Sequence, residues 1–164
     1  ESLVVAARDR GGLMVVDPVA RPPRLRWETA AGDCLRIVGV AEASVVVEYC
    51  SAARLGKIVA FDAVAGRVAA MRQGGINVSG PAVMAGGVIL QPVAEEVAGK
   101  PRLAITAVDP TTLEFFGQPF SLSPADSSTA AAGSPQPQAI SLAITPSAVI
   151  VASSSQLVSL GPAP

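Results

Sequence analysis

Residues 58–63 read IVAFDA, and this pattern, apolar residues followed by Asp and then Ala or Pro, recurs along the chain. Copies lie at residues 13–18 (LMVVDP) and 105–110 (ITAVDP), and a degenerate fourth copy lies at residues 157–162 (LVSLGP). The three aspartates are 45 and 47 residues apart, and the fourth copy follows 52 residues later. A period of about 40–50 residues with several short strands in each repeat is typical of β-propeller blades. The pattern therefore predicts an all-β fold built from four-stranded antiparallel blades.

Short β-branched runs bounded by turn residues surround each copy and indicate strands. They predict one partial propeller domain over residues 1–164, with the first unit starting at its second strand and the last ending after its third. That makes about three and a half blades. We expect blade-like units at residues 1–30, 31–75, 76–122 and 139–164, with a flexible Ser-, Ala- and Pro-rich loop at 123–138.

An open arc of blades would expose sheet faces and unpaired strand edges. We therefore expect another protein chain or a second copy to complete the ring. A compact β-sandwich or barrel that happens to repeat is the alternative interpretation of the same strands.

The composition limits the classes of molecule that this chain is expected to bind. The chain is 50% hydrophobic and 15% charged, with a formal net charge of −1. Nucleic-acid binding normally needs a basic surface, and the short cluster Arg21, Arg24 and Arg26 indicates a solvated loop and strand. We therefore expect no nucleic acid as a partner. Charged residues are absent from residues 74–94 and 127–164, but Pro and Gly or Ser interrupt both stretches, so neither predicts a transmembrane segment.

The recurring aspartates indicate turn chemistry. The carboxylate of Asp62 can cap the turn that follows its strand, and Gly66 can take the left-handed conformation that such a turn needs. Asp17 and Asp109 occupy the same place in their copies. We interpret all four residues as structural parts of the repeat.

Residues 58–67 (IVAFDAVAGR), followed by 79–83 (SGPAV) and 86–90 (GGVIL), resemble the repeat of pyrroloquinoline-quinone-like β-propellers. The resemblance implies a strand, an Asp-containing turn that ends in Gly, and an outer strand that usually carries Trp. Trp27 falls at that Trp position in the first unit, and Met71 and Phe116 are expected to fill similar docking positions. The family includes envelope-assembly lipoproteins and quinone-dependent dehydrogenases.

Residues that usually carry catalysis are scarce. The chain has no His, which removes Ser-His-Asp and Cys-His nucleophiles and the usual zinc sites. Glu95 and Glu96, the only adjacent acidic pair, are expected at a solvated hairpin tip. With one Asn, Asn77, and one Trp, the sequence offers no Ca²⁺ and quinone site of the kind that the resemblance implies for the dehydrogenases. We expect no enzyme activity, no metal and no cofactor.

The two cysteines suggest a compartment. A hairpin centred on Glu42 would place Cys34 opposite Cys50, Arg36 opposite Glu48 and Val38 opposite Val46. Directly opposed strand residues have a Cα separation of about 4.5–5.5 Å, which suits a disulfide. A disulfide would indicate an oxidising compartment: periplasm, cell surface or exterior. Two buried free thiols are the alternative.

The function most consistent with these features is a non-catalytic, extracytoplasmic propeller that acts as a protein-binding scaffold in an envelope or cell-surface assembly. The partner would be an envelope protein, and loops at residues 94–101 and 123–138 are the expected contact sites. The alternatives are part of a quinoprotein-type oxidoreductase completed by other blades, or a ligand-sensing ectodomain.

Overall fold

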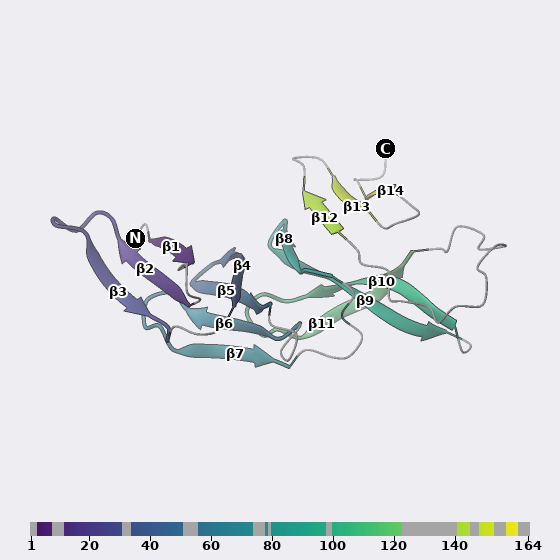
Figure 1. Ribbon diagram of the computed structural model, residues 1–164, viewed down its shortest axis with the longest axis horizontal. Helices are drawn as coiled ribbons and strands as arrows, with labels where there is room; N and C mark the ends of the chain where they lie inside the picture. Colours follow the sequence, from purple (N-terminus) through teal and green to yellow (C-terminus); the bar gives the residue numbers. More distant parts are fainter. Residues whose placement is uncertain are drawn as a thin grey trace. The chain divides into compact units, whose positions relative to one another are not determined.

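The computed structural model describes residues 3–7, 12–30, 34–50, 56–73, 78, 80–97, 100–122, 141–144, 148–152 and 157–160. Within these residues, fourteen β-strands form four antiparallel sheets, and there is no helix (Figure 1). Strands that follow one another in the sequence are neighbours in the sheet, so every sheet is an up-and-down meander. The prediction of an all-β fold with four-stranded antiparallel units is confirmed.

The second and third sheets along the chain have four strands each. The strands of the second sheet are β4 (Leu35–Ala41), β5 (Ser44–Tyr49), β6 (Ile58–Asp62) and β7 (Val68–Arg72). Those of the third sheet are β8 (Val83–Ala85), β9 (Val88–Val97), β10 (Lys100–Val108) and β11 (Phe115–Ser121).

The first and fourth sheets have three described strands each. The first contains β1 (Val4–Ala7), β2 (Leu13–Asp17) and β3 (Arg24–Glu28). The fourth contains β12 (Ser141–Ile144), β13 (Val149–Ala152) and β14 (Leu157–Leu160). The recurring phrase falls on β2, β6, β10 and β14. The first sheet thus corresponds to strands two to four of a complete sheet, and the fourth sheet to strands one to three.

The chain divides into two compact units. One contains residues 1–75 and 109–114, and therefore the first two sheets; the other contains residues 76–108 and 115–164, and therefore the third and fourth sheets. The single domain expected over residues 1–164 stays a prediction. The loop expected at residues 123–138 lies outside the described residues.

One predicted loop is wrong. Residues 94–101 were expected to form a loop, but β9 continues to Val97 and β10 begins at Lys100, with Lys100 opposite Val97 and Arg102 opposite Glu95. The charged pair Glu95-Glu96 suggested a solvated tip, but the two residues lie opposite Arg102 and Pro101 in the ladder between β9 and β10. The main chain of both glutamates belongs to a strand.

The core of the first unit forms where β5 and β6 meet side chains of the first sheet. Val45, Val47, Val59 and Phe61 pack in one buried cluster with Leu13, and Trp27 of β3 packs against its margin. Side chains alternate along a strand, so Val46 and Glu48 point to the opposite face of β5, and these are buried too. Strand β5 is therefore buried on both faces, which explains its nearly continuous run of valines.

Trp27 fixes the first sheet against the turn that follows β6. Its indole Nε1 donates a hydrogen bond to the Ala63 carbonyl at 2.8 Å, and its ring centroid lies 5.7 Å from that of Phe61. A Cβ atom built on Gly66 would lie 2.5 Å from Cγ of Trp27. The indole therefore occupies the space in which any other residue at position 66 would place its side chain.

The docking expected for Met71 and Phe116 is wrong. Their side chains are 54% and 46% exposed, respectively. A thioether or a phenyl ring lacks the N–H group with which the indole of Trp27 is anchored to a main-chain carbonyl.

We predict that Gly66→Ala destabilises the protein more than Gly86→Ala does. Both glycines have positive φ, 69° and 57°, so both substitutions carry a similar cost for the left-handed backbone, of about 1 kcal/mol. Only the Gly66 methyl group meets Trp27, whereas nothing lies within 4 Å at Gly86. We expect a further loss of about 1–3 kcal/mol in the free energy of unfolding for Gly66→Ala. Urea titrations of both variants measure it, and equal losses would contradict the steric role of Trp27.

Candidate functional site

The three recurring aspartates form the same local structure. Oδ1 of Asp62 accepts hydrogen bonds from the main-chain N–H groups two and three residues later, at 2.9 and 2.8 Å. Asp109 does the same at 2.7 and 2.8 Å, and Asp17 at 3.0 and 3.2 Å. Each carboxylate therefore stabilises the turn that leads out of the third strand of its sheet.

The turns of the second and third sheets also have the same main-chain conformation. Gly66 donates its N–H to the Asp62 carbonyl at 2.9 Å, and Leu113 donates to the Asp109 carbonyl at 2.8 Å. Both donors are left-handed, with φ of 69° and 59°. A leucine thus takes the conformation that Gly66 takes in the second sheet. The left-handed backbone alone does not require glycine here, and at position 66 the requirement comes from Trp27.

The turn at Asp17 differs from the other two because its carboxylate also binds a side chain. Arg26 of β3 donates from Nη2 to Oδ2 of Asp17 at 2.6 Å, so this carboxylate joins the turn to the neighbouring strand. The bond to Arg26 is the largest cause that holds the pKa of Asp17 below its usual range. For Asp62 and Asp109 the main cause of a lowered pKa is the pair of main-chain N–H donors, those of Ala65 and Val64 and those of Thr112 and Thr111.

We predict that Asp62→Asn weakens the pH dependence of stability. Because the pKa of Asp62 is lowered in the folded protein, its charge stabilises the fold above the unfolded value, about 3.9. This contribution is lost as the pH falls through the folded-state pKa. Asn keeps an oxygen acceptor but no charge, so its deficit relative to the wild type should be largest above about pH 4 and should shrink on acidification. Denaturant unfolding from pH 2.5 to pH 7 measures this difference.

As a control, Asp62→Ala removes the acceptor itself, so it should remain destabilised across the whole pH range. If the loss in the free energy of unfolding caused by Asp62→Asn grows on acidification, the assignment is contradicted.

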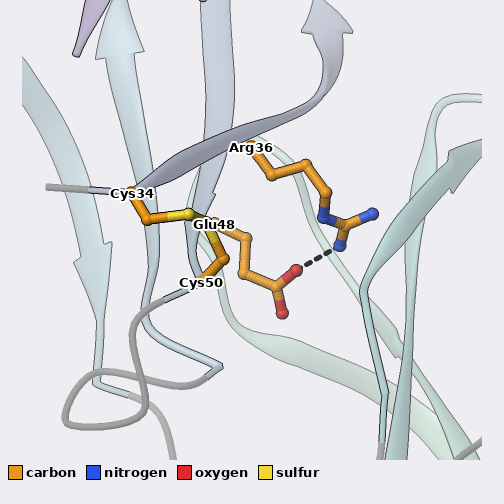
Figure 2. The surroundings of a disulfide bond; sticks show 4 residues. All are labelled: Cys34, Arg36, Glu48 and Cys50. Atoms are coloured by element: carbon orange, nitrogen blue, oxygen red, sulfur yellow. Dashed lines mark hydrogen bonds and ion pairs between the residues drawn. A yellow bond between two sulfur atoms is a disulfide. The ribbon is translucent and has the colours of Figure 1, made fainter. Parts of the chain in front are cut away.

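The cysteines form the second feature singled out by the sequence. Cys34 and Cys50 are joined by a disulfide, with their Cα atoms 5.3 Å apart, next to the ion pair of Arg36 with Glu48 (Figure 2). The Cys50 N–H also donates to the Cys34 carbonyl at 3.0 Å, which extends the β4–β5 ladder by one pair. The disulfide therefore joins the open ends of this hairpin.

The predicted hairpin register holds near the disulfide and fails near the turn. Arg36 lies opposite Glu48, as expected, but Val46 lies opposite Gly39 and not opposite Val38. A bulge at this point shifts the ladder by one residue. The shift follows from the turn, because the strands close through the two residues between Ala41 and Ser44, with Glu42 at a φ of 48°.

The ion pair belongs to a row of residues that runs across all four strands of the second sheet. Arg36 pairs with Glu48, Glu48 with Ile58, and Ile58 with Arg72, so the four side chains share one face. The Glu48 side chain is only 4% exposed, and burial lowers the pKa of Arg72. The sequence indicated the first pair but not Arg72, whose place could be found only from the registers of β6 and β7.

We predict that the double variant Cys34→Ser with Cys50→Ser lowers the free energy of unfolding by about 3 kcal/mol. The bond closes a loop of 16 residues, and a cross-link over about 15 residues stabilises a fold by roughly that amount by restricting the unfolded chain. Chemical denaturation without reductant measures the difference. Reductant should bring the wild type to the stability of the variant, and two titratable thiols in the unreduced, denatured protein would contradict the assignment.

The structure assembles no other candidate site from its described residues. In the ranges given above, no three Cys, Asp or Glu side chains come together as metal ligands. The same residues contain no helix long and apolar enough to cross a membrane.

Comparison with known proteins supports the fold. No protein-family model matches the chain, and no curated protein matches it. The crystal structure of the computationally designed Ika4 protein is similar with a TM-score of 0.58 and 11% identity, over 98% of this chain and 87% of that chain. BamB from Moraxella catarrhalis gives a TM-score of 0.49 and 16% identity, over 96% of this chain but only 45% of BamB. The repeated four-stranded meander and the similarity to the designed propeller-like protein identify the sheets of this chain as β-propeller blades.

Proposed function

We propose that this chain is a non-catalytic, extracytoplasmic propeller module that binds another protein as part of an envelope or cell-surface assembly. The observation that carries the proposal is the distribution of exposed apolar side chains. Among the described residues, ten large hydrophobic side chains are exposed, and six of them lie on the last strands of the first three sheets. These six are Leu25 on β3, Val68 and Met71 on β7, and Phe115, Phe116 and Phe120 on β11.

Single exposed apolar residues are ordinary, whereas neighbouring exposed apolar residues on one sheet face are typical of interaction surfaces. In the first unit we assign the contact to Leu25, Val68 and Met71. Val68 and Met71 pair with Phe61 and Val59, so they continue the face of the sheet on which the core lies. A partner that covers them would extend that apolar layer outward.

Two further parts of the proposal concern the compartment and the repeat. The Cys34–Cys50 disulfide supports an oxidising compartment, because disulfides rarely persist in reducing cytosol. The turn formed by Asp62 and Gly66, with Trp27 docked on it, supports a repeat of the pyrroloquinoline-quinone-like type. The carboxylates of the aspartates that begin these turns accept hydrogen bonds from main-chain N–H groups. This supports a structural role for them and not a catalytic one.

Site-specific photo-cross-linking tests the proposed function. A benzophenone side chain at Met71 should give one discrete cross-linked product in envelope extracts of the native source, because a bound partner covers that side chain. The same probe at Glu42, which is exposed at the β4–β5 turn of the same unit, should give none. Identical products at both positions, or none at Met71, would contradict protein binding. Stoichiometric quinone or Ca²⁺ in the purified protein would contradict a non-catalytic role.

A further inference from the structure

The hairpin formed by β2 and β3 carries an excess of positive charge. Residues 17–26 contain Arg21, Arg24 and Arg26 against the single carboxylate of Asp17, a net charge of +2 in a chain whose formal net charge is −1. Arg21 and Arg24 are exposed. Among the residues that the structure describes, neither of them takes part in an ion pair. Both guanidinium groups are therefore available to a ligand that brings its own negative charge.

The carboxylate of Asp17 is committed to groups of the hairpin itself. Its Oδ1 accepts hydrogen bonds from two main-chain N–H groups of the turn, and its Oδ2 accepts one from Nη2 of Arg26 at 2.6 Å. Arg24 lies opposite Asp17 in the β2–β3 ladder but forms no ion pair with it. One guanidinium group of the hairpin thus already binds a carboxylate, and the two exposed ones offer the same chemistry.

The face of the first sheet that carries Arg24 is the one that packs on the second sheet. Side chains alternate along β2, so Leu13 and Asp17 share a face, and Arg24 shares it because it pairs with Asp17. Leu13 belongs to the buried cluster that the second sheet completes. On the second sheet, Val68 and Met71 continue the facing side of that cluster, and each is 54% exposed. Two facing sheet faces therefore end in a basic margin and an apolar margin.

These margins are not explained by neighbouring repeats of the chain. Each face of a sheet serves one neighbour in a propeller, and this face of the first sheet already serves the second. A neighbour on the other side of the first sheet would meet the face of Met14 and Val16, which lie between the cluster residues along β2. Residues 127–164 carry no charge, so they cannot neutralise the arginines.

We propose that the β2–β3 hairpin recognises an acidic segment of a protein partner, whose carboxylates bind Arg21 and Arg24 and whose apolar side chains cover Val68 and Met71. This inference rests on the proposed function, because it names the chemistry of the partner that the function requires. Charge complementarity selects the acidic residues, since guanidinium groups bind carboxylates through paired N–H donors. The alternation of side chains along an extended segment would direct acidic residues to one margin and apolar residues to the other.

An anionic membrane fits the same charges less well. Segments that anionic lipids attract usually cluster about four to eight Lys or Arg residues, and this hairpin has three Arg. Membrane-surface segments also place aromatic or large apolar side chains in the headgroup layer. The single aromatic residue of the hairpin, Trp27, is held against Gly66 and bonded to the Ala63 carbonyl, so its indole is not available for that role.

A synthetic peptide of alternating acidic and apolar residues is the probe. In fluorescence anisotropy, a labelled ELELELE peptide should bind the 164-residue protein saturably. The uncharged peptide QLQLQLQ should bind about tenfold more weakly or worse. Raising the salt concentration from about 0.1 M to about 1 M shortens the screening length from about 10 Å to about 3 Å and should remove most of this difference. Equal binding of the two peptides, or binding of neither, would overturn the proposal.

Variants of the hairpin locate the site. Arg21→Gln combined with Arg24→Gln should weaken the binding of ELELELE by about tenfold or more and leave that of QLQLQLQ unchanged. Gln118→Glu is the matched control for Arg24→Gln alone, because it changes the net charge equally at an exposed position of β11, on a different sheet. Its affinity should stay within about twofold of the wild type. Equal losses in these two single variants would reduce the effect to net charge and overturn the site.

The cross-link at Met71 separates this inference from the proposed function. In envelope extracts, the discrete product should fade when the probe at Met71 is combined with Arg21→Gln and Arg24→Gln. An undiminished product would overturn acidic recognition and leave the proposed function standing. Binding of ELELELE without any product at Met71 would support acidic recognition and contradict the contact assigned to Met71.

Vesicles of phosphatidylcholine and phosphatidylglycerol test the membrane directly. Sedimentation of the wild type with these vesicles, lost in the double variant and accompanied by equal binding of the two peptides, would identify lipid as the ligand and overturn the proposal. Absence of sedimentation, together with preferential binding of ELELELE, is the expected result.

Discussion

The contact between Trp27 and the turn after β6 is the constraint on which the first unit depends. A single indole fills the space above Gly66, donates to the Ala63 carbonyl and lies beside Phe61. It thereby connects a last strand to the turn of the following sheet, and the buried valines of β5 pack beneath it. The turn must be narrow for this to happen, and the Asp62 carboxylate keeps it so by holding two main-chain N–H groups.

The same turn is built without the indole in the third sheet. Asp109 repeats the hydrogen bonds of Asp62, and Leu113 repeats the backbone conformation of Gly66. Leu113 is itself buried, with an exposure of 3%, so here the turn supplies its own apolar side chain. The repeat therefore conserves the main-chain geometry of the turn and varies the side chain that fills the space beside it.

Most of the fold could be predicted from the sequence, because the relevant signals are local. The phrase at residues 13–18, 58–63, 105–110 and 157–162 marks the third strand of each sheet, and the turn residues Asp17, Asp62 and Asp109 act on their own next neighbours. The opposition of Cys34 and Cys50 followed from hairpin geometry. The predictions that were wrong concern features that depend on longer-range effects. The bulge in β4 comes from the type of turn, the extension of β9 from cross-strand pairing, and the exposure of Met71 from the absence of an indole-like anchor.

The pairing of Trp27 with Gly66 also makes the repeats non-interchangeable. A turn with glycine at its left-handed position fits after any sheet, because it imposes no side chain on its surroundings. A turn with leucine at that position, such as the one at residues 109–114, cannot follow the first sheet, because its side chain and the indole would claim the same volume. Trp27 and the lack of a side chain at Gly66 thus restrict which turn can follow the first sheet along this chain. Shuffling whole repeats would have to move Trp27 and Gly66 together, although they belong to different sheets.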